Sequence, residues 1–128
     1  MADDHPLQTL EALVLIAVGG FVGANLRYAV AQVVPGLGGT LLANVSGSVV
    51  LGFLLYEALY TGVLAERTRV VLGTGFLSSF TTYSTFVVQS VQAGPVLFVG
   101  NVAATYALGF AGVLVGRRLA RSLDGGRL

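Results

Sequence analysis

A run of hydroxyl side chains interrupts the middle of a long apolar segment of this chain. Of the nine residues from Ser78 to Phe86, six carry an aliphatic hydroxyl and a seventh, Tyr83, carries a phenol. The surrounding segment, residues 69–92, is otherwise apolar enough for a membrane-spanning helix. Hydrocarbon offers such groups no water, so they must face protein, a cavity or an ion. Because Ser and Thr also compete for backbone hydrogen bonds, we expect this helix to break near the bilayer midplane.

The composition indicates an integral membrane protein. Only 10% of the 128 residues are charged, whereas soluble domains carry about 25%. Three further apolar segments, at about 10–34, 40–60 and 96–116, are each long enough to span. We therefore predict an all-α protein in which residues 1–128 form one four-span unit with a broken third helix. The net charge of +1, with no basic patch outside the C-terminal tail, predicts no nucleic-acid partner.

Small and polar residues also mark the other three spans. In the first, the small residues among 19–24 would let another helix approach closely. In the second, Asn44 shares a face with Ser48, and its amide either packs between helices or donates to an anion; the spacing alone favours packing. In the fourth, Asn101 and Thr105 form a polar stripe that should point inward. Arg27 has two interpretations that stay open: a charge reaching the membrane surface, or a charge facing a polar cavity.

The residue types present exclude several kinds of chemistry. The chain has no cysteine and a single histidine, His5, and its apolar spans carry no paired carboxylates, so we predict that it is not an enzyme. A proton-coupled multidrug exporter would need a carboxylate inside the membrane, but Glu11 and Glu57 lie at the ends of their spans. A purely structural subunit would not need so many polar groups at the midplane. The residues alone therefore predict a polar site at the midplane that binds an ion of unknown sign, and packing between helices stays open as the alternative.

The ordered motifs resemble those of the Fluc (CrcB-type) fluoride channels. In the first span the matching residues are Gly19, Gly20, Gly23, Ala24, Arg27 and Tyr28. In the second they are Gly39, Thr40, Leu41, Asn44, Gly47 and Ser48. In the third they are Gly75, Phe76 and the run from Thr81 to Phe86. Each motif alone is weak, but three in the same order in a four-span chain are specific.

The resemblance implies a passive fluoride export channel in the cell membrane, built as an antiparallel dual-topology dimer. It places Asn44, Tyr83, Ser84 and Phe86 along the fluoride pore, and Thr105 on the polar track of the fourth span. Arg27 would stand at a vestibule.

The resemblance also implies a structural, non-transported sodium ion at the dimer centre. Its ligands would be the backbone carbonyls of Ser78 and Thr81 from both subunits. This chain departs from the family pattern in two places: Ser78 and Ser79 replace the usual glycines, and Tyr83 replaces a phenylalanine. The first keeps the carbonyls, and the second adds a hydroxyl that needs a partner.

The distribution of arginine predicts one preferred orientation. With four spans, both termini and the loop at 61–68 share a side, which holds the following arginines: Arg67, Arg69, Arg117, Arg118, Arg121 and Arg127. The opposite loops hold no Lys or Arg, so the termini should be cytoplasmic. A homodimer of both orientations should show little bias, so we hypothesise that this chain inserts in one orientation and pairs with an oppositely inserted homologue. A second copy of the chain is the alternative partner. The tail after Gly116 is expected to fray.

Overall fold

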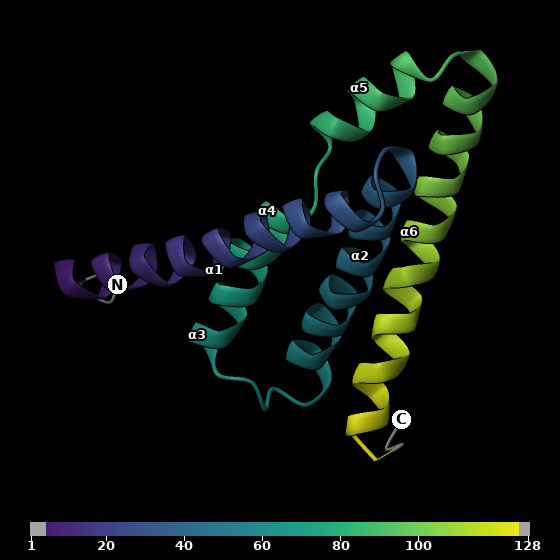
Figure 1. Ribbon diagram of the computed structural model, residues 1–128. Coiled ribbons are helices and arrows are strands. Elements are labelled where there is room, and N and C mark those ends of the chain that lie inside the picture. Colours follow the sequence, from purple (N-terminus) through teal and green to yellow (C-terminus); the bar gives the residue numbers. More distant parts are fainter. Residues whose placement is uncertain (1–4, 126–128) are drawn as a thin grey trace.

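The computed structural model describes residues 5–125, and every regular element in that range is helical (Figure 1). Three helices are long and apolar enough to cross a membrane: α1 (Pro6–Val33), α2 (Leu37–Tyr60) and α6 (Pro95–Leu123). The remaining apolar segment is divided into α3 (Glu66–Arg69), the π-helix η1 (Val70–Leu77), α4 (Ser78–Phe80) and α5 (Ser84–Gln92). The structure thus has three candidate spans, α1, α2 and α6, and one broken span, which is the third along the chain.

Helices α2 and α6 lie side by side and run in the same direction (Figure 1). Glycines bring the two backbones together. A Cβ atom added to Gly52 would lie 2.8 Å from the Cα atom of Val113, and one added to Gly116 would overlap the carbonyl of Val49. Larger residues at these positions would therefore separate the helices that carry Asn44 and Thr105.

Helix α1 packs in the same way against η1. A Cβ atom on Gly75 would lie 2.8 Å from the carbonyl oxygen of Ile16, and Cβ atoms on Gly19 and Gly23 would overlap the backbone of the third span. The small residues at 19–24 therefore make the predicted close helix contact. The π-helix itself was not predicted; its wider turns include Gly73 and Gly75, which the sequence marked only as loosening the helix.

The third span breaks inside the hydroxyl run, as predicted. Helix α4 ends at Phe80, Thr81 has an extended backbone (φ −82°, ψ 158°), and α5 begins at Ser84. Figure 1 shows α5 carried away from α4 by this extended segment. The break leaves the last carbonyls of α4 and the first amides of α5 without a continuous helix to pair them.

The end of α6 corrects one expectation. The tail after Gly116 does not fray but continues as helix to Leu123. Two of its arginines lie over tyrosine rings of α2, with Arg117 Cζ 5.2 Å from the centre of the Tyr56 ring and Arg121 Cζ 5.8 Å from that of Tyr60. These contacts hold the last turns against α2.

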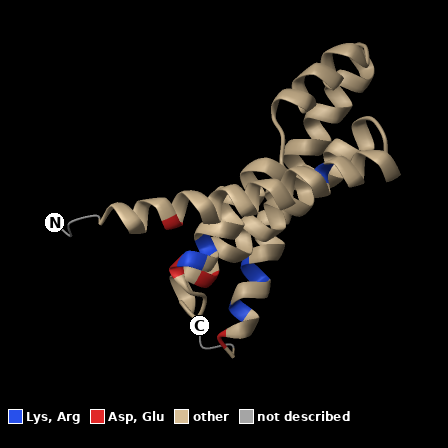
Figure 2. Cartoon of the chain, turned by 60° about the vertical axis from the view of Figure 1, so that its left-hand side comes forward, with Lys and Arg blue, Asp and Glu red and all other residues tan. Residues whose placement is uncertain are grey.

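Most charged side chains gather at one end of the molecule, around the connection between α2 and α3 and the end of α6 (Figure 2). Two ion pairs tie this end together: Arg67 to Glu11 at 2.7 Å and Arg69 to the buried Glu57 at 3.1 Å. Arg27 stands apart and contacts the break. Arg127, which was counted for the orientation, lies outside the described residues.

Candidate functional site

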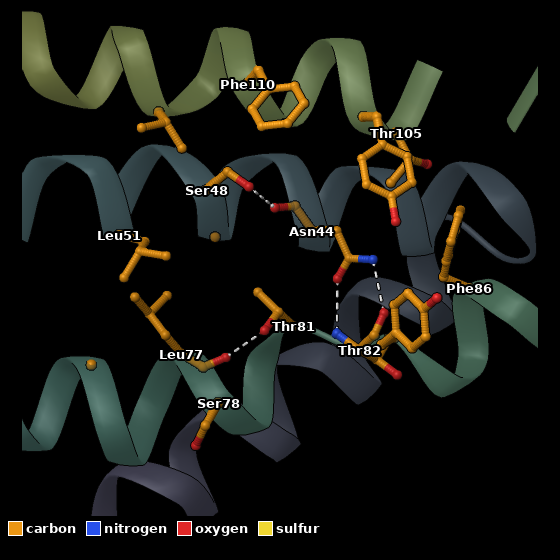
Figure 3. A pocket seen from close by; sticks show the side chains of 16 residues that line it. Asn44, Ser48, Leu51, Leu77, Ser78, Thr81, Thr82, Phe86, Thr105 and Phe110 are labelled. Carbon is orange, nitrogen blue, oxygen red and sulfur yellow. Dashed lines mark hydrogen bonds between the residues drawn. The ribbon is translucent and has the colours of Figure 1, made fainter. Parts of the chain in front are cut away.

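A cavity of about 540 Å³ lies between α2, the broken span and α6 (Figure 3). Its polar groups come from Asn44 and Ser48 of α2, the hydroxyl run and Thr105 of α6, and aromatic rings fill much of the remaining wall. Every described residue that lines it is uncharged. The cavity therefore offers neutral hydrogen-bond donors and ring edges rather than a fixed charge.

The side chain of Asn44 holds the break in place. Its Oδ1 accepts the N–H of Thr82 at 2.8 Å, and its Nδ2 donates to the carbonyl of Thr82 at 2.9 Å (Figure 3). This pair of bonds reproduces, from a neighbouring helix, what a continuous backbone would supply. One of the two amide hydrogens of Asn44 is thus committed to Thr82. The packing and donor interpretations of Asn44 are therefore compatible.

The hydroxyl of Thr105 is a buried donor of the cavity. Its Oγ1 is buried and has no hydrogen-bond partner within residues 5–125. Buried polar groups are almost always paired, and an unpaired one points to an ion, a water or a ligand. The polar stripe predicted on the fourth span therefore includes a donor that faces the cavity.

Four aromatic rings form one connected row along the cavity. Tyr83 lies 5.8 Å from Phe86, Phe86 meets Tyr106 edge-on at 6.3 Å and 77°, and Tyr106 lies 6.4 Å from Phe110. Phe86 is buried, whereas 70% of the Tyr83 surface is exposed. The sequence reasoning named the first two rings and missed Tyr106 and Phe110, whose four-residue spacing beside Thr105 was the available signal.

The structure brings most of the predicted site residues to this cavity. Asn44, Tyr83, Phe86 and Thr105 line it, as do Ser78 and Thr81, which were assigned to sodium. Ser84 is exposed and does not line it. Thr82 was not singled out, although its N–H donates to Asn44 and its carbonyl accepts from Asn44. Its hydroxyl also accepts Thr85 N–H at 3.3 Å.

Arg27 lies on the other side of the break, beside a second cavity of about 350 Å³. Its Nη1 donates to the carbonyl of Thr81 at 3.4 Å. Thr40 and Gln89 also line this cavity and are joined by a hydrogen bond of 2.7 Å. Thr82 lines both cavities. The break therefore lies between the cavity that contains Arg27 and the central cavity, whose described lining is uncharged.

A further pair of polar residues fixes α5 to α6. Asn101 Nδ2 donates to the hydroxyl of Ser90 at 2.8 Å, and that hydroxyl donates to the carbonyl of Phe86 at 2.6 Å. Only 1% of Ser90 is exposed. Through Ser90, Asn101 of the fourth span thus anchors the backbone carbonyl of Phe86.

The oxygen atoms at the end of α4 are compatible with a cation. The α-helical partner of the Ser78 carbonyl would be Thr82 N–H, but that group donates to Asn44 instead. The Thr81 carbonyl receives Arg27, which leaves one of its two lone pairs. Broken-helix carbonyls of this kind suit sodium. Within residues 5–125 no cluster of His, Cys, Asp or Glu could hold a metal ion, so a cation here would rely on carbonyls.

The carboxylates required by the exporter hypothesis are already engaged. Glu57 accepts the N–H of Leu64 at 2.8 Å and two N–H groups of Arg69 at 3.2 and 3.1 Å. Glu11 pairs with Arg67. Neither carboxylate lines the central cavity. This arrangement weighs against a proton-exchanging carboxylate in the pathway.

Comparison with known proteins connects this geometry to one family. Residues 14–117 match the model of the family described as CrcB-like protein, Camphor Resistance (CrcB). A "Fluoride-specific ion channel FluC 1" of Haloarcula marismortui is 58% identical over 126 residues, which cover 98% of each chain. A "Fluoride-specific ion channel FluC 2" of Halobacterium salinarum is 58% identical over 88% of this chain and 89% of the relative. A "FluC 1" of Natronomonas pharaonis is 47% identical over 87% and 95%. These relatives are named as ion channels and not as enzymes.

Proposed function

Because this chain belongs to the CrcB-like family, we propose that it forms a fluoride-specific channel that lets fluoride leave the cell passively across the plasma membrane. The names of the relatives supply the ion. The observation in this chain that carries the proposal is the buried, unpartnered hydroxyl of Thr105 in an uncharged, aromatic-walled cavity. Fluoride is small and strongly hydrated, so a pore must replace its water with donors. Neutral donors and positive ring edges can do so without holding the ion permanently.

The residues divide the work along the path. Arg27 would raise the local concentration of anions in the second cavity, and Thr82 stands between that cavity and the central one. Beyond the break, Asn44 and Thr105 would donate to the ion while Tyr83 and Phe86 present their rings. Ser84 is exposed beside these rings. In this proposal it faces the pore once the partner subunit covers it.

The proposal includes a structural sodium ion at the centre of an antiparallel dimer. The Ser78 and Thr81 carbonyls of this chain would hold it, and their availability at the end of α4 supports the assignment. Bound there, the ion would supply a fixed positive charge that satisfies carbonyls at the ends of two broken helices. The Arg27 guanidinium would stay on the outer side of the Thr81 carbonyl and keep that peptide oriented.

The partner is either a second copy or an oppositely inserted homologue. The gathering of charge at one end (Figure 2) supports a fixed orientation, with the termini in the cytoplasm. The relatives' names, which carry the numbers 1 and 2, are compatible with paired chains. A reporter fused to the C-terminus of the chain expressed alone decides between them. Equal signal from the two membrane faces would contradict a fixed orientation.

The direct test is anion efflux from liposomes that contain the purified chain, with and without a homologous partner. We expect loss of fluoride, followed with a fluoride electrode, while chloride is retained. Phe86→Ala should reduce the flux, and Val91→Ala, on the exposed surface of the same helix, should not. Absence of fluoride flux in both preparations, or equal loss of chloride, would refute the proposal.

A further inference from the structure

The last turns of α6 hold two arginines on a platform of two tyrosines. Tyr56 and Tyr60 of α2 stack with their ring centres 5.7 Å apart and their planes 22° apart. Arg117 and Arg121 lie over these rings, one turn apart along α6. Because α2 and α6 run in the same direction, two residues four positions apart on α6 meet two residues four positions apart on α2. The result is an ordered pair of guanidinium groups.

Stacking orders a guanidinium without neutralising it. The ring covers one face of the planar group, whereas the N–H donors point outward in its plane and stay available. Neither Arg117 nor Arg121 forms an ion pair within residues 5–125, where the ion pairs join Arg67 to Glu11 and Arg69 to Glu57. Arg121 is exposed, whereas Arg117 is half-buried and its Nε is enclosed without an acceptor in that range. Among the described residues the two arginines therefore present positive charge that no ion pair neutralises, and Arg121 presents it most openly.

The position of this pair along the helix indicates what the anion is. Arg117 lies 22 residues after the first residue of α6, about 33 Å along the axis at 1.5 Å per residue. The hydrocarbon core is about 30 Å thick. The two guanidinium groups therefore lie at the level of the lipid headgroups. Leu114, three residues before Arg117, is 54% exposed and offers apolar surface one turn deeper.

We propose that Arg117 and Arg121, held by Tyr56 and Tyr60, bind the phosphate of an anionic lipid headgroup. Planar guanidinium groups match phosphate oxygens in two-point contacts. The acyl chains of the same lipid would pack against the exposed apolar side of α6. This site is separate from the ion path: none of its four residues lines either cavity beside the break.

The test uses the full chain in detergent, titrated with short-chain phosphatidylglycerol and followed by native mass spectrometry and thermal shift. Phosphatidylcholine and inorganic phosphate are titrated in parallel. We expect phosphatidylglycerol to bind at least about tenfold more tightly than either, since each charge-assisted bond contributes that order of preference. Equal binding of the two lipids, or equal protection by inorganic phosphate, would overturn the proposal without the need for any variant.

Four variants then test the platform. Arg121→Gln should weaken phosphatidylglycerol binding about tenfold, whereas Arg67→Gln, which removes the same charge from the exposed surface of α3, should not. Tyr56→Leu with Tyr60→Leu should weaken binding at unchanged net charge, and the corresponding Phe pair should restore it because the rings remain. If Arg121→Gln and Arg67→Gln weakened phosphatidylglycerol binding equally, the lipid would be attracted by overall charge and not by this site. Unchanged binding in the Leu pair would show that the tyrosines do not organise the site.

Discussion

The hydrogen bonds between Asn44 and Thr82 are predicted to hold the broken helix in its cavity-lining position. Asn44→Ala removes both at once, leaving the N–H and the carbonyl of Thr82 without partners. Each group left unsatisfied costs about 1–3 kcal/mol when buried, so the pair would cost about 2–6 kcal/mol. Thr82 is only half-buried, which places the expected cost near the lower end, at about 2–3 kcal/mol.

This energy should appear as local opening of α5 rather than as global unfolding. At 1.4 kcal/mol for each tenfold change, a cost of about 2–3 kcal/mol raises the open population roughly 30- to 150-fold. Hydrogen–deuterium exchange in lipid nanodiscs measures it directly, through the peptide that contains the first turn of α5, where Val87 N–H donates to Tyr83. Fluoride flux should fall in the same variant.

Ser48→Ala is the matched control. Ser48 lines the same cavity one turn along α2, but its hydroxyl donates to the carbonyl of Asn44 within its own helix, at 2.9 Å. Its loss should leave the exchange of α5 unchanged, because the clamp on Thr82 remains. Unchanged protection of α5 in Asn44→Ala would refute the clamp, and so would equal loss of protection in the two variants.

Three further substitutions separate packing, positioning and ion contact. Thr105→Val keeps the shape and removes the unpaired hydroxyl, so it should raise thermal stability by about 1 kcal/mol while fluoride efflux falls; unchanged efflux would show that the hydroxyl does not meet the ion. Gly116→Ala places a Cβ against the α2 backbone and should cost about 1–3 kcal/mol in thermal unfolding, whereas Gly100→Ala, where nothing lies within 4 Å, should cost nothing measurable. Ser90→Ala breaks the link from Asn101 to the carbonyl of Phe86 and should lower fluoride efflux without changing the elution volume in size-exclusion chromatography; normal efflux would show that Phe86 needs no such anchor.

The sequence predicted the framework because membrane physics acts on composition and spacing. Long apolar runs define the spans, and glycines at a four-residue spacing predict where helix backbones meet, as Gly19 and Gly23 do against η1. The hydroxyl run predicted where the third span is weakest, and the break lies within the expected nine residues. Each of these features depends on residues near one another in the chain, which is why one sequence sufficed.

The features that were missed depend on contacts between distant segments. No local pattern shows that Thr82 N–H turns to Asn44, 38 residues away. The π-helical turns of η1 are stabilised by their close fit to α1 and leave no clear sequence signal. The order of the α6 tail likewise depends on Tyr56 and Tyr60 of another helix, whereas its sequence reads as a charged, fraying end.

Three hydroxyls of the run that first indicated a polar site donate to groups of their own span. Ser78 donates to carbonyls of Thr74 and Gly75, Thr81 donates to Leu77 at 2.8 Å, and Thr82 donates to Thr85 at 3.1 Å. Such bonds stabilise a distorted helix end, and a hydroxyl whose hydrogen is engaged in this way does not donate it to an ion. The run therefore serves mainly to make the break, and the break turns Thr82 toward Asn44. The donors open to an anion include the Thr105 hydroxyl on α6 and the second amide hydrogen of Asn44. Replacing Ser78, Thr81 or Thr82 should therefore alter the shape of the cavity, whereas replacing Thr105 should alter the affinity for the ion.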